Sequence, residues 1–490
     1  WSLKVIKMAS ATSTGSKTLS VLLFPHFATS HIEPFTELAL RLAASRPDAA
    51  VEAIVAVTPA NVPVVQSFLD RRWHGHSAAT VKIVTYPFPT VEGLPKGVEN
   101  LGKAATQADS MLINLAASSD TLMRPAQEAL IRARSPDAIF TDMLFTWSSD
   151  IADELGVPCV AFNVVGAFPM LAMRHLLMED AAIDGDDMVT APPFPIPPIR
   201  VPRTELPDLS ISRYIFDKVY SMQAACFGLA VNTFSGLEQQ YCDMYLGQGY
   251  VQRSYFVGPL SLQLQSSDSD QSATDAGDSQ YIDWLDTKPD HSVVYVSFGT
   301  CALASEAQLD QIALGLEASG KSFLWVVRGA DKWAPPKGWE KRVDDRGIVI
   351  RSWAPQTAIL AHPAVGAFVT QCGWNSVIEA VAAGVPMLTW PKVYEQFITE
   401  RLITDVLGIG ERLWPHGAGL RSEDYEKHEV IPAHDVARAL LTFMHPGGPG
   451  EVMRTRVMDL ASKSRAAMAE GGSSQNDLHR LVNDLIAARG

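Results

Sequence analysis

A histidine and an aspartate in the first third of the chain have the side chains of a proton-transfer pair. His31 lies in the loop after a short apolar run of strand-forming residues, Leu19–Phe24, and Asp142 follows a second such run, Ala138–Phe140. An imidazole titrates near neutral pH and can take a proton from a hydroxyl group, and a neighbouring carboxylate orients it and makes it more basic. A lone loop histidine is more often a surface residue, and an aspartate after a strand is often a helix cap. Two such residues, each at the end of a different strand, are candidates for a catalytic pair, and the sequence context described below favours catalysis.

A second polar motif follows the apolar run Gly366–Thr370. Residues Gln371–Ser376 (QCGWNS) are predicted to form a tight turn into a helix that ends at Gly384. A strand, a glycine turn and a helix N-terminus together point several backbone N–H groups at one place, where the helix dipole is positive. This arrangement suits a diphosphate and needs neither a metal nor a cluster of cations. Glu379, one turn into the helix, can accept hydrogen bonds from ribose hydroxyls.

Both motifs need a sheet behind them, and the alternation of strands and helices predicts one in each half of the chain. The other predicted strands are Val51–Val57, Val81–Tyr86, Cys159–Phe162, Val293–Phe298, Phe323–Val327, Ile348–Ile350 and Val385–Trp390. The expected fold class is α/β, with two Rossmann-like doubly wound domains facing a cleft. Open sheets of this kind bind ligands at the carboxyl ends of their strands, so the cleft is the expected ligand site.

A polar segment divides the two halves. Ser266–Ser279 is rich in Ser, Asp and Gly and poor in apolar residues, which is typical of a flexible connection. We predict an amino-terminal domain over 8–260, a linker over 261–280, a carboxy-terminal domain over 281–470 and a terminal helix over 471–490. Trp1–Lys7 contain no continuous apolar stretch and are left out of the predicted fold.

Composition excludes several classes of protein. The 490 residues are 47% hydrophobic and 19% charged, which is typical of a globular protein, and the net charge of −14 argues against a nucleic-acid partner. The five cysteines are scattered, without C-x-x-C spacing, so neither a disulfide framework nor a zinc site is expected. No apolar run is long enough to span a bilayer, and the expected location is the cytoplasm.

The segment Trp353–Gln396 resembles the signature box of the plant family-1 UDP-glycosyltransferases. It contains W-x-P-Q, L-x-H, Q-C-G-W-N-S, a following Glu, G-V-P, W-P and E-Q at the family's positions. Val296–Thr300, Phe323–Val327 and Glu470–Ser474 also match, and they extend the resemblance over nearly the whole chain. At the other end, Pro25–Pro34 keeps the family's spacing of Pro, His and Pro around His31, a spacing that His26 does not fit.

The resemblance implies a GT-B fold whose carboxy-terminal domain binds a UDP-sugar and whose amino-terminal domain binds an acceptor. Trp353 would stack on uracil, Ala354 and Gln356 would hold the base or ribose, and Glu379 would bind the ribose hydroxyls. Thr300, Gln371, Gly373, Asn375 and Ser376 would face the diphosphate, and Glu395 and Gln396 would bind the sugar. Trp374 together with Gln396 indicates UDP-glucose as the donor. His31 and Asp142 would be the catalytic pair, and the terminal helix would pack back on the amino-terminal domain.

Four residues depart from the family pattern. Gln371 stands where His is usual, and an amide still donates to a phosphate oxygen but carries no charge. Glu395 stands where Asp is also common, which would allow a shift of the donor sugar toward xylose or galactose. Thr29 and Ser30 replace Gln-Gly before His31, and without the glycine the backbone of that loop has less conformational freedom.

The expected activity is inverting, metal-independent transfer of a hexose to a hydroxyl of a flavonoid, another phenolic or, as the alternative, a terpenoid or steroid. This is a reaction of plant secondary metabolism, with the UDP-sugar as co-substrate, no other cofactor and a monomeric enzyme. Two D-x-D runs, Asp184–Asp186 and Asp268–Asp270, lie in polar loops and are not expected to bind a metal. The acceptor is expected to touch apolar side chains of the amino-terminal domain, namely Phe27, Phe88, Phe145, Phe162, Phe168, Met170 and Met188. An epimerase or hydrolase on the same fold, or a UDP-sugar-binding protein without activity, are the competing hypotheses.

Overall fold

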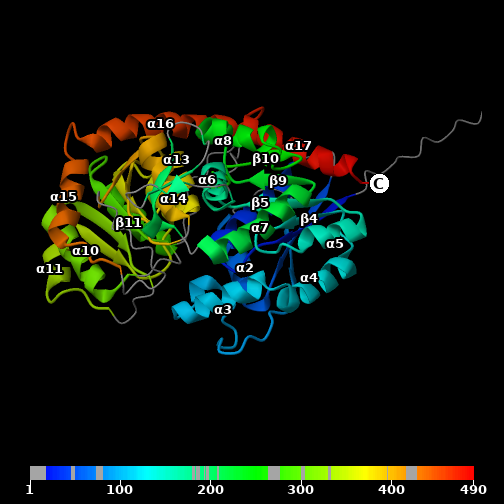
Figure 1. Cartoon of the computed structure of the whole chain (residues 1–490). Coiled ribbons are helices and arrows are strands. Elements are labelled where there is room, and N and C mark those ends of the chain that lie inside the picture. Colours follow the sequence, from blue (N-terminus) through cyan, green and yellow to red (C-terminus); the bar gives the residue numbers. More distant parts are fainter. Residues whose placement is uncertain are drawn as a thin grey trace, which may run out of the picture.

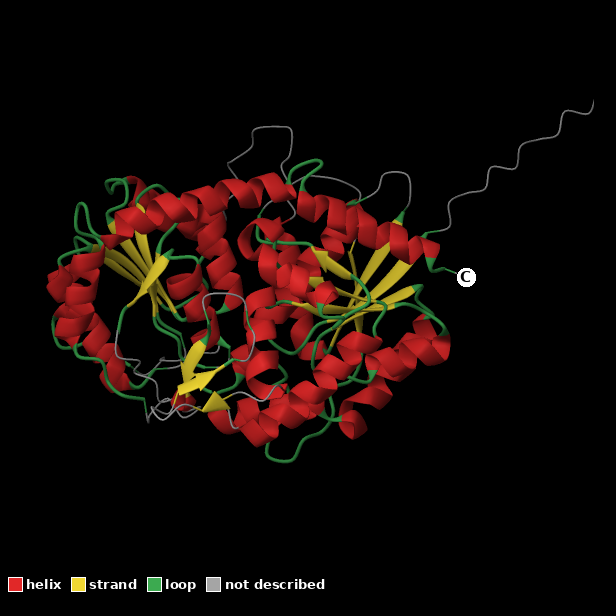
Figure 2. Ribbon diagram, turned by 45° about the horizontal axis from the view of Figure 1, so that its top comes forward, coloured by secondary structure: helices red, strands yellow, loops and turns green. Residues whose placement is uncertain are grey.

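The computed structural model describes residues 18–45, 50–72, 81–178, 182–183, 188–191, 194, 198–206, 209–262, 276–299, 304–328, 333–393, 395–414 and 428–489. They form two α/β domains, each with helices on both sides of a parallel sheet (Figures 1 and 2). The predicted pair of doubly wound domains is confirmed.

The amino-terminal domain is built on a seven-stranded parallel sheet in the order β10-β9-β5-β4-β1-β2-β3. Its strands are β1 (Leu19–Phe24), β2 (Val51–Val57), β3 (Val81–Thr85), β4 (Ala138–Thr141), β5 (Cys159–Asn163), β9 (Gly228–Val231) and β10 (Ser254–Phe256). Along β1, Val21 and Leu23 pack into one hydrophobic cluster while Leu22 and Phe24 pack into another. Both faces of the strand are therefore buried, which explains why it is a continuous apolar run rather than an alternating one.

Helices and a small sheet surround this central sheet. The helices are α1 (Thr29–Ala44), α2 (Val62–Arg72), α3 (Gln107–Ser118), α4 (Asp120–Arg134), α5 (Ser148–Leu155), α6 (Ala167–Met178), α7 (Leu209–Ala225) and α8 (Ser235–Gly247), with the 3₁₀ turns η1 (Pro59–Asn61), η2 (Leu101–Lys103) and η3 (Arg203–Glu205). The small sheet is antiparallel and contains β6 (Ala182–Ile183), β7 (Met188–Thr190) and β8 (Arg200–Pro202). Strands β9 and β10 and these three strands, each two to four residues long, were not predicted from the sequence.

The carboxy-terminal domain repeats the architecture with a six-stranded parallel sheet in the order β13-β12-β11-β14-β15-β16. Its strands are β11 (Val293–Ser297), β12 (Ser322–Val326), β13 (Gly347–Ile350), β14 (Val365–Thr370), β15 (Met387–Thr389) and β16 (Gly410–Arg412). Its helices are α9 (Ala276–Asp286), α10 (Glu306–Ser319), α11 (Trp339–Val343), α12 (Gln356–Ala361), α13 (Trp374–Ala383), α14 (Gln396–Arg401), the π-helical turn η4 (Leu402–Val406) and α15 (Ala433–Phe443). As predicted, α13 ends at Gly384, which adopts the left-handed conformation with φ +76°.

The last two helices connect the domains. Helix α16 (Pro449–Met468) runs along the top of the molecule, and α17 (Ser473–Ala487) lies on the amino-terminal domain (Figure 1). Leu481 and Leu485 of α17 are buried in that domain, and Tyr255 of β10 donates a 2.7 Å hydrogen bond to Asp484. None of the described helices combines the length and apolar character that are needed to cross a bilayer.

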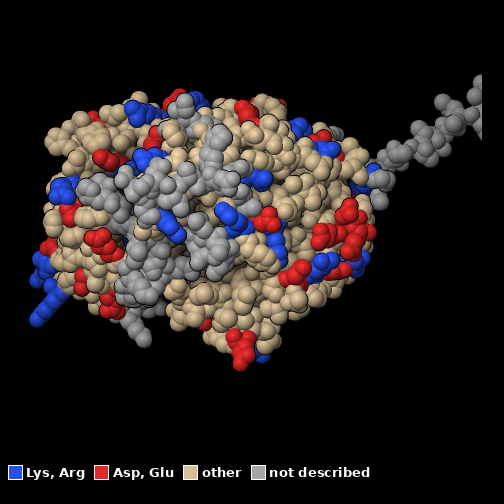
Figure 3. All heavy atoms as spheres, in the orientation of Figure 1, with Lys and Arg blue, Asp and Glu red and all other residues tan. Residues whose placement is uncertain are grey.

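Surface charge is mostly balanced locally on the face shown in Figure 3, where acidic side chains gather near α4 and α5. Arg132 of α4 pairs there with Glu128 and Glu154 at 2.7 Å, and Arg124 lies 3.2 Å from Glu128. Exposed pairs of this kind contribute little to stability. They mark a solvated surface rather than a site.

Candidate active site

The order of each sheet reverses at one point, and the site lies there. β1 neighbours β4 in the first sheet and β11 neighbours β14 in the second, so the loops after these strands open a crevice in each domain. The strand ends are level, because Phe24 pairs with Thr141 and Ser297 pairs with Thr370. The residues that follow each strand pair are therefore brought together.

In the first crevice the predicted pair meets. His31 is in the first turn of α1 and Asp142 directly follows β4, and Nδ1 of the imidazole lies 2.8 Å from Oδ2 of the carboxylate. The backbone N–H of His26 donates to the same oxygen at 3.1 Å. The aspartate side chain is 1% exposed and the histidine side chain 19%, so the carboxylate lies behind the ring and the ring faces the cleft. With Nδ1–H donated to Asp142, Nε2 is the nitrogen that can accept a proton.

The electrostatics of the pair favour charge separation. Burial by itself would lower the pKa of His31, but the charge and hydrogen bond of Asp142, with a smaller contribution from Glu395, raise the pKa above its ordinary value. Burial would raise the pKa of Asp142, and the neighbouring His31, followed by His26, lowers the pKa below its ordinary value. The carboxylate thus stays ionised and makes the imidazole a stronger base.

His26 lies beside this pair but has a different character. Its ring is buried, 5.2 Å from the ring of His31 between centroids, and burial lowers its pKa to about 4. It therefore stays neutral across the physiological pH range.

The second crevice presents the N-terminus of α13. Gly373 is the cap residue of the helix, and it has no side chain that could cap the first-turn N–H groups. Cys372 before it has φ +68°, a left-handed conformation that is uncommon outside glycine and turns the chain sharply out of β14. Gly299, after β11, has φ +70°, and a Cβ there would lie 2.3 Å from Nε2 of Gln371. Glycine at 299 therefore leaves room for the Gln371 amide between the two loops.

One wall of this crevice is a hydrogen-bonded group of four side chains. Gln356 donates from Nε2 to Ser376 at 3.0 Å and to Glu379 at 2.8 Å, and its Oε1 accepts from Tyr295 at 3.2 Å. Three of these residues were predicted donor contacts, whereas Tyr295 was missed. Tyr295 is a strand residue of β11, and only the fold shows that its hydroxyl reaches Gln356.

Trp353 and the residues near α14 complete the donor side. Trp353 is 41% exposed, so its ring is available to stack on a planar group. Oε1 of Gln396 accepts from the backbone N–H groups of Lys392 and Val393, both at 3.0 Å, which leaves the Nε2 group as a donor. Glu395 precedes it as the cap residue of α14. Thr300, a predicted diphosphate contact, lies outside the described residues, as do both D-x-D runs.

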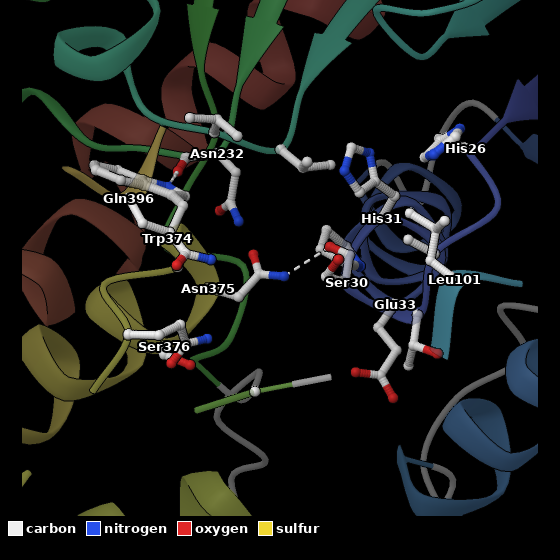
Figure 4. Close-up of a pocket in the computed structure, with 18 of the residues that line it drawn as sticks. His26, Ser30, His31, Glu33, Leu101, Asn232, Trp374, Asn375, Ser376 and Gln396 are labelled. Carbon is white, nitrogen blue, oxygen red and sulfur yellow. Dashed lines mark hydrogen bonds between the residues drawn. The ribbon is translucent and has the colours of Figure 1, made fainter. Parts of the chain in front are cut away.

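Two of the predicted donor residues contact the amino-terminal domain instead of standing free in the cleft. Nε1 of Trp374 donates to the backbone oxygen of Asn232 at 2.7 Å, and Nδ2 of Asn375 donates to the backbone oxygen of Ser30 at 2.7 Å. Figure 4 shows Asn375 and Ser30 facing each other between the domains, with His31 beside them. The motif predicted to bind the diphosphate thus also contributes hydrogen bonds between the two domains.

A single cavity of about 1010 Å³ joins the two crevices. It is lined by the predicted base and by every predicted donor residue that the structure describes: His31, Trp353, Ala354, Gln356, Gln371, Gly373, Trp374, Asn375, Ser376, Glu379, Glu395 and Gln396. Among the described parts of the chain, no group of three His, Cys, Asp or Glu side chains is arranged to hold a metal ion.

The predicted aromatic lining of the acceptor side needs correction. Phe27, Phe145, Phe162 and Phe168 are all buried in the hydrophobic core, and none of them lines the cavity. Their rings contact other core aromatics, as in the 4.8 Å approach of Phe162 to Phe35. Phe88 and Met188 do not line the cavity either, whereas Met170 does.

The apolar wall comes mainly from three helices. It contains Met111, Leu112 and Leu115 of α3, Met170 and Met173 of α6, and Ile215 and Phe216 of α7. Met111 and Leu115 are 57% and 56% exposed, which is unusual for large apolar side chains. Their four-residue spacing on one face of a helix was visible in the sequence, but nothing in the sequence distinguishes a cavity-lining face from a core-packing one.

Comparisons with known proteins agree with this geometry. The family model described as UDP-glucoronosyl and UDP-glucosyl transferase matches residues 253–408. The chain is 34% identical to UDP-glucosyl transferase 73DL1 of Saponaria officinalis over 462 residues, 90% of each chain. It is 32% identical to UDP-glucose flavonoid 3-O-glucosyltransferase 7 of Fragaria ananassa, covering 95% of this chain and 96% of that one. Among solved structures, Glycyrrhiza uralensis UGT73P12, complexed with glycyrrhetinic acid 3-O-monoglucuronide, superposes with a TM-score of 0.82 at 31% identity over 96% of both chains.

Proposed function

Because this chain belongs to the plant family-1 UDP-glycosyltransferases, and is thus a UDP-glycosyltransferase with the GT-B fold, we propose that it moves glucose from UDP-glucose to a hydroxyl of a small, largely apolar plant metabolite. A flavonoid or another phenolic is the first acceptor class, supported by the similarity to a flavonoid 3-O-glucosyltransferase. A terpenoid or steroid is the alternative, since the cavity wall is apolar over three helices.

The observation that carries the proposal is the His31–Asp142 pair in the same cavity as the N-terminus of α13. Nε2 of His31 takes the proton of the acceptor hydroxyl, and Asp142 stabilises the imidazolium that forms. The acceptor oxygen then bonds to the anomeric carbon as the bond from that carbon to the diphosphate oxygen breaks. Attack on the face opposite the departing UDP inverts the configuration.

The leaving diphosphate gains negative charge, and the N-terminus of helix α13 stabilises that charge. Backbone N–H groups of the first turn of α13, after Gly373, and the positive end of the helix dipole stabilise this charge without a metal. We propose that one chain is the complete enzyme, a monomer, because it supplies both walls of the cavity.

The proposal is tested by incubating the protein with UDP-glucose and a mixed panel of phenolics and terpenoids. Mass spectrometry then follows the mass of each acceptor. A gain of one hexose on any member supports transfer and names the acceptor class. UDP formed with no acceptor modified would instead indicate a hydrolase, and UDP bound without turnover would indicate a binding protein.

His31→Ala tests the assignment of the base. Loss of a general base slows turnover by roughly 10²–10⁴-fold. UDP affinity should stay almost unchanged, because His31 belongs to the acceptor side. Unaffected turnover would contradict its role.

A further inference from the structure

An arginine from the amino-terminal domain lies over the predicted uracil platform. The guanidinium of Arg71, in the last turn of α2, is 4.5 Å from the centroid of the Trp353 ring in the other domain. This distance is within the range of a cation–π contact. Both side chains line the cavity.

The guanidinium is held in place from its own domain. Nη2 donates to Glu33 at 2.7 Å and Nη1 donates to Ser67 at 2.6 Å, while the ring of Phe68 lies 6.0 Å away. Glu33 is on α1, two residues after His31, and Figure 4 shows both on this helix, across the pocket from the motif of α13. The position of Arg71 is therefore tied to the helix that carries the base.

Cations are scarce in this cavity. Among the described lysines and arginines only Arg71 and Arg328 line it, whereas four carboxylates do: Glu33, Glu37, Glu379 and Glu395. A UDP-sugar brings two negative charges, and the family's usual histidine is replaced by the uncharged Gln371. A cation at the uridine end of the site would therefore matter for donor affinity.

We propose that Arg71 is a donor-binding residue supplied by the amino-terminal domain, whose guanidinium packs against the uracil–Trp353 stack and adds positive charge beside the nucleotide. Guanidinium groups stack on flat rings and also attract phosphate, so one side chain serves both purposes. Because Arg71 and Trp353 belong to different domains, their contact also links the two domains beside the nucleotide. The inference rests on the proposed function, since it assigns a residue to the same donor.

Calorimetric titration with UDP tests it, using wild-type protein, Arg71→Ala and Arg71→Lys. We expect Arg71→Ala to weaken UDP binding about 3- to 30-fold, the range of a partly desolvated cation–π contact. Arg71→Lys should fall between, because it keeps the charge and loses the flat stacking surface. The salt dependence of UDP affinity should decrease in Arg71→Ala.

Arg132→Ala is the matched control, because Arg132 also pairs with glutamates but lies on the surface of α4. It should bind UDP like the wild type. Unchanged or tighter binding by Arg71→Ala would overturn the inference alone, and tighter binding would mean that the guanidinium competes with the base for the indole. A wild-type protein that does not bind UDP would instead overturn the proposed function together with this inference.

Discussion

The basicity of His31 comes from a buried carboxylate, and this fixes how activity should depend on pH. The base must be neutral to accept a proton, so kcat/KM should fall as pH falls through the pKa of His31. Asp142 raises that pKa, so the fall should begin above the ordinary histidine value of about 6.5. A pH–rate profile from pH 5 to 9 measures it.

Asp142→Asn provides the decisive comparison. Without the charge, the pKa of His31 should drop, and the acidic limb should move to lower pH while the plateau falls by about 10²–10⁴-fold. A limb that stays in place would show that Asp142 does not set the basicity. His26 cannot produce the limb, because its pKa of about 4 keeps it neutral throughout the measured range.

The Trp353 side chain is partly exposed and is proposed to bind uracil. A substitution there should therefore change UDP affinity without changing protein stability. At 41% exposure its removal leaves no buried cavity, so Trp353→Ala should change the melting temperature by less than about 2 °C. Loss of base stacking, about 1–3 kcal/mol, should weaken UDP binding roughly 5- to 150-fold. Trp353→Phe should recover part of the affinity. Normal UDP binding by the alanine variant would contradict the stacking assignment.

Among the elements, the loops after β1, β4 and β14 could be predicted from the sequence, and the helices lining the acceptor side could not. Strand ends are marked by apolar runs that stop at polar or glycine residues, as at Thr370 and Gln371. Short strands such as β16 have no such contrast. Met111 and Leu115 of α3 have the same spacing as any buried helical face, and only the packing of the other elements leaves them facing the cavity.

The start of α6 is an element that depends on one glycine. A Cβ at Gly166 would lie 2.1 Å from the indole of Trp374, whose own N–H is bonded to Asn232. Gly166→Ala must therefore displace the indole, and we expect a loss of about 1–3 kcal/mol in unfolding free energy together with a higher KM for UDP-glucose. Denaturant unfolding and donor kinetics measure the two effects.

Gly247→Ala is the control, because nothing lies within 4 Å of a Cβ at that position in α8. It should be neutral for both stability and KM. A Gly166→Ala variant that behaves like this control would show that neither stability nor the KM for UDP-glucose depends on the present position of the Trp374 indole.

The molecule as a whole has a buried ion pair between its domains, far in sequence from the proposed catalytic pair His31 and Asp142. Arg401, at the end of α14, lies 2.6 Å from Glu205 in η3 and 3.2 Å from Glu400. All three side chains are less than a tenth exposed. Since α14 begins with Gln396, this pair connects a predicted sugar-binding residue to the amino-terminal domain. No sequence pattern marks it, because its partners lie on different domains and each residue alone looks like an ordinary surface charge.

Removing Arg401 should lower the free energy of unfolding by more than the net contribution of the ion pair. The reason is that the negative charges of Glu205 and Glu400 stay buried with less positive charge beside them. We expect Arg401→Met to lower the unfolding free energy by about 3–5 kcal/mol, and the double variant Glu205→Met/Arg401→Met to recover part of that loss.

Burial already raises the pKa of Glu205, while Arg401 opposes this rise. A raised folded-state pKa makes stability decrease as pH rises above the unfolded value of about 4.3, so the loss in Arg401→Met should be larger at pH 8 than at pH 5. Equal losses at both pH values, or a double variant no more stable than the single one, would show that Glu205 is not the charge Arg401 compensates.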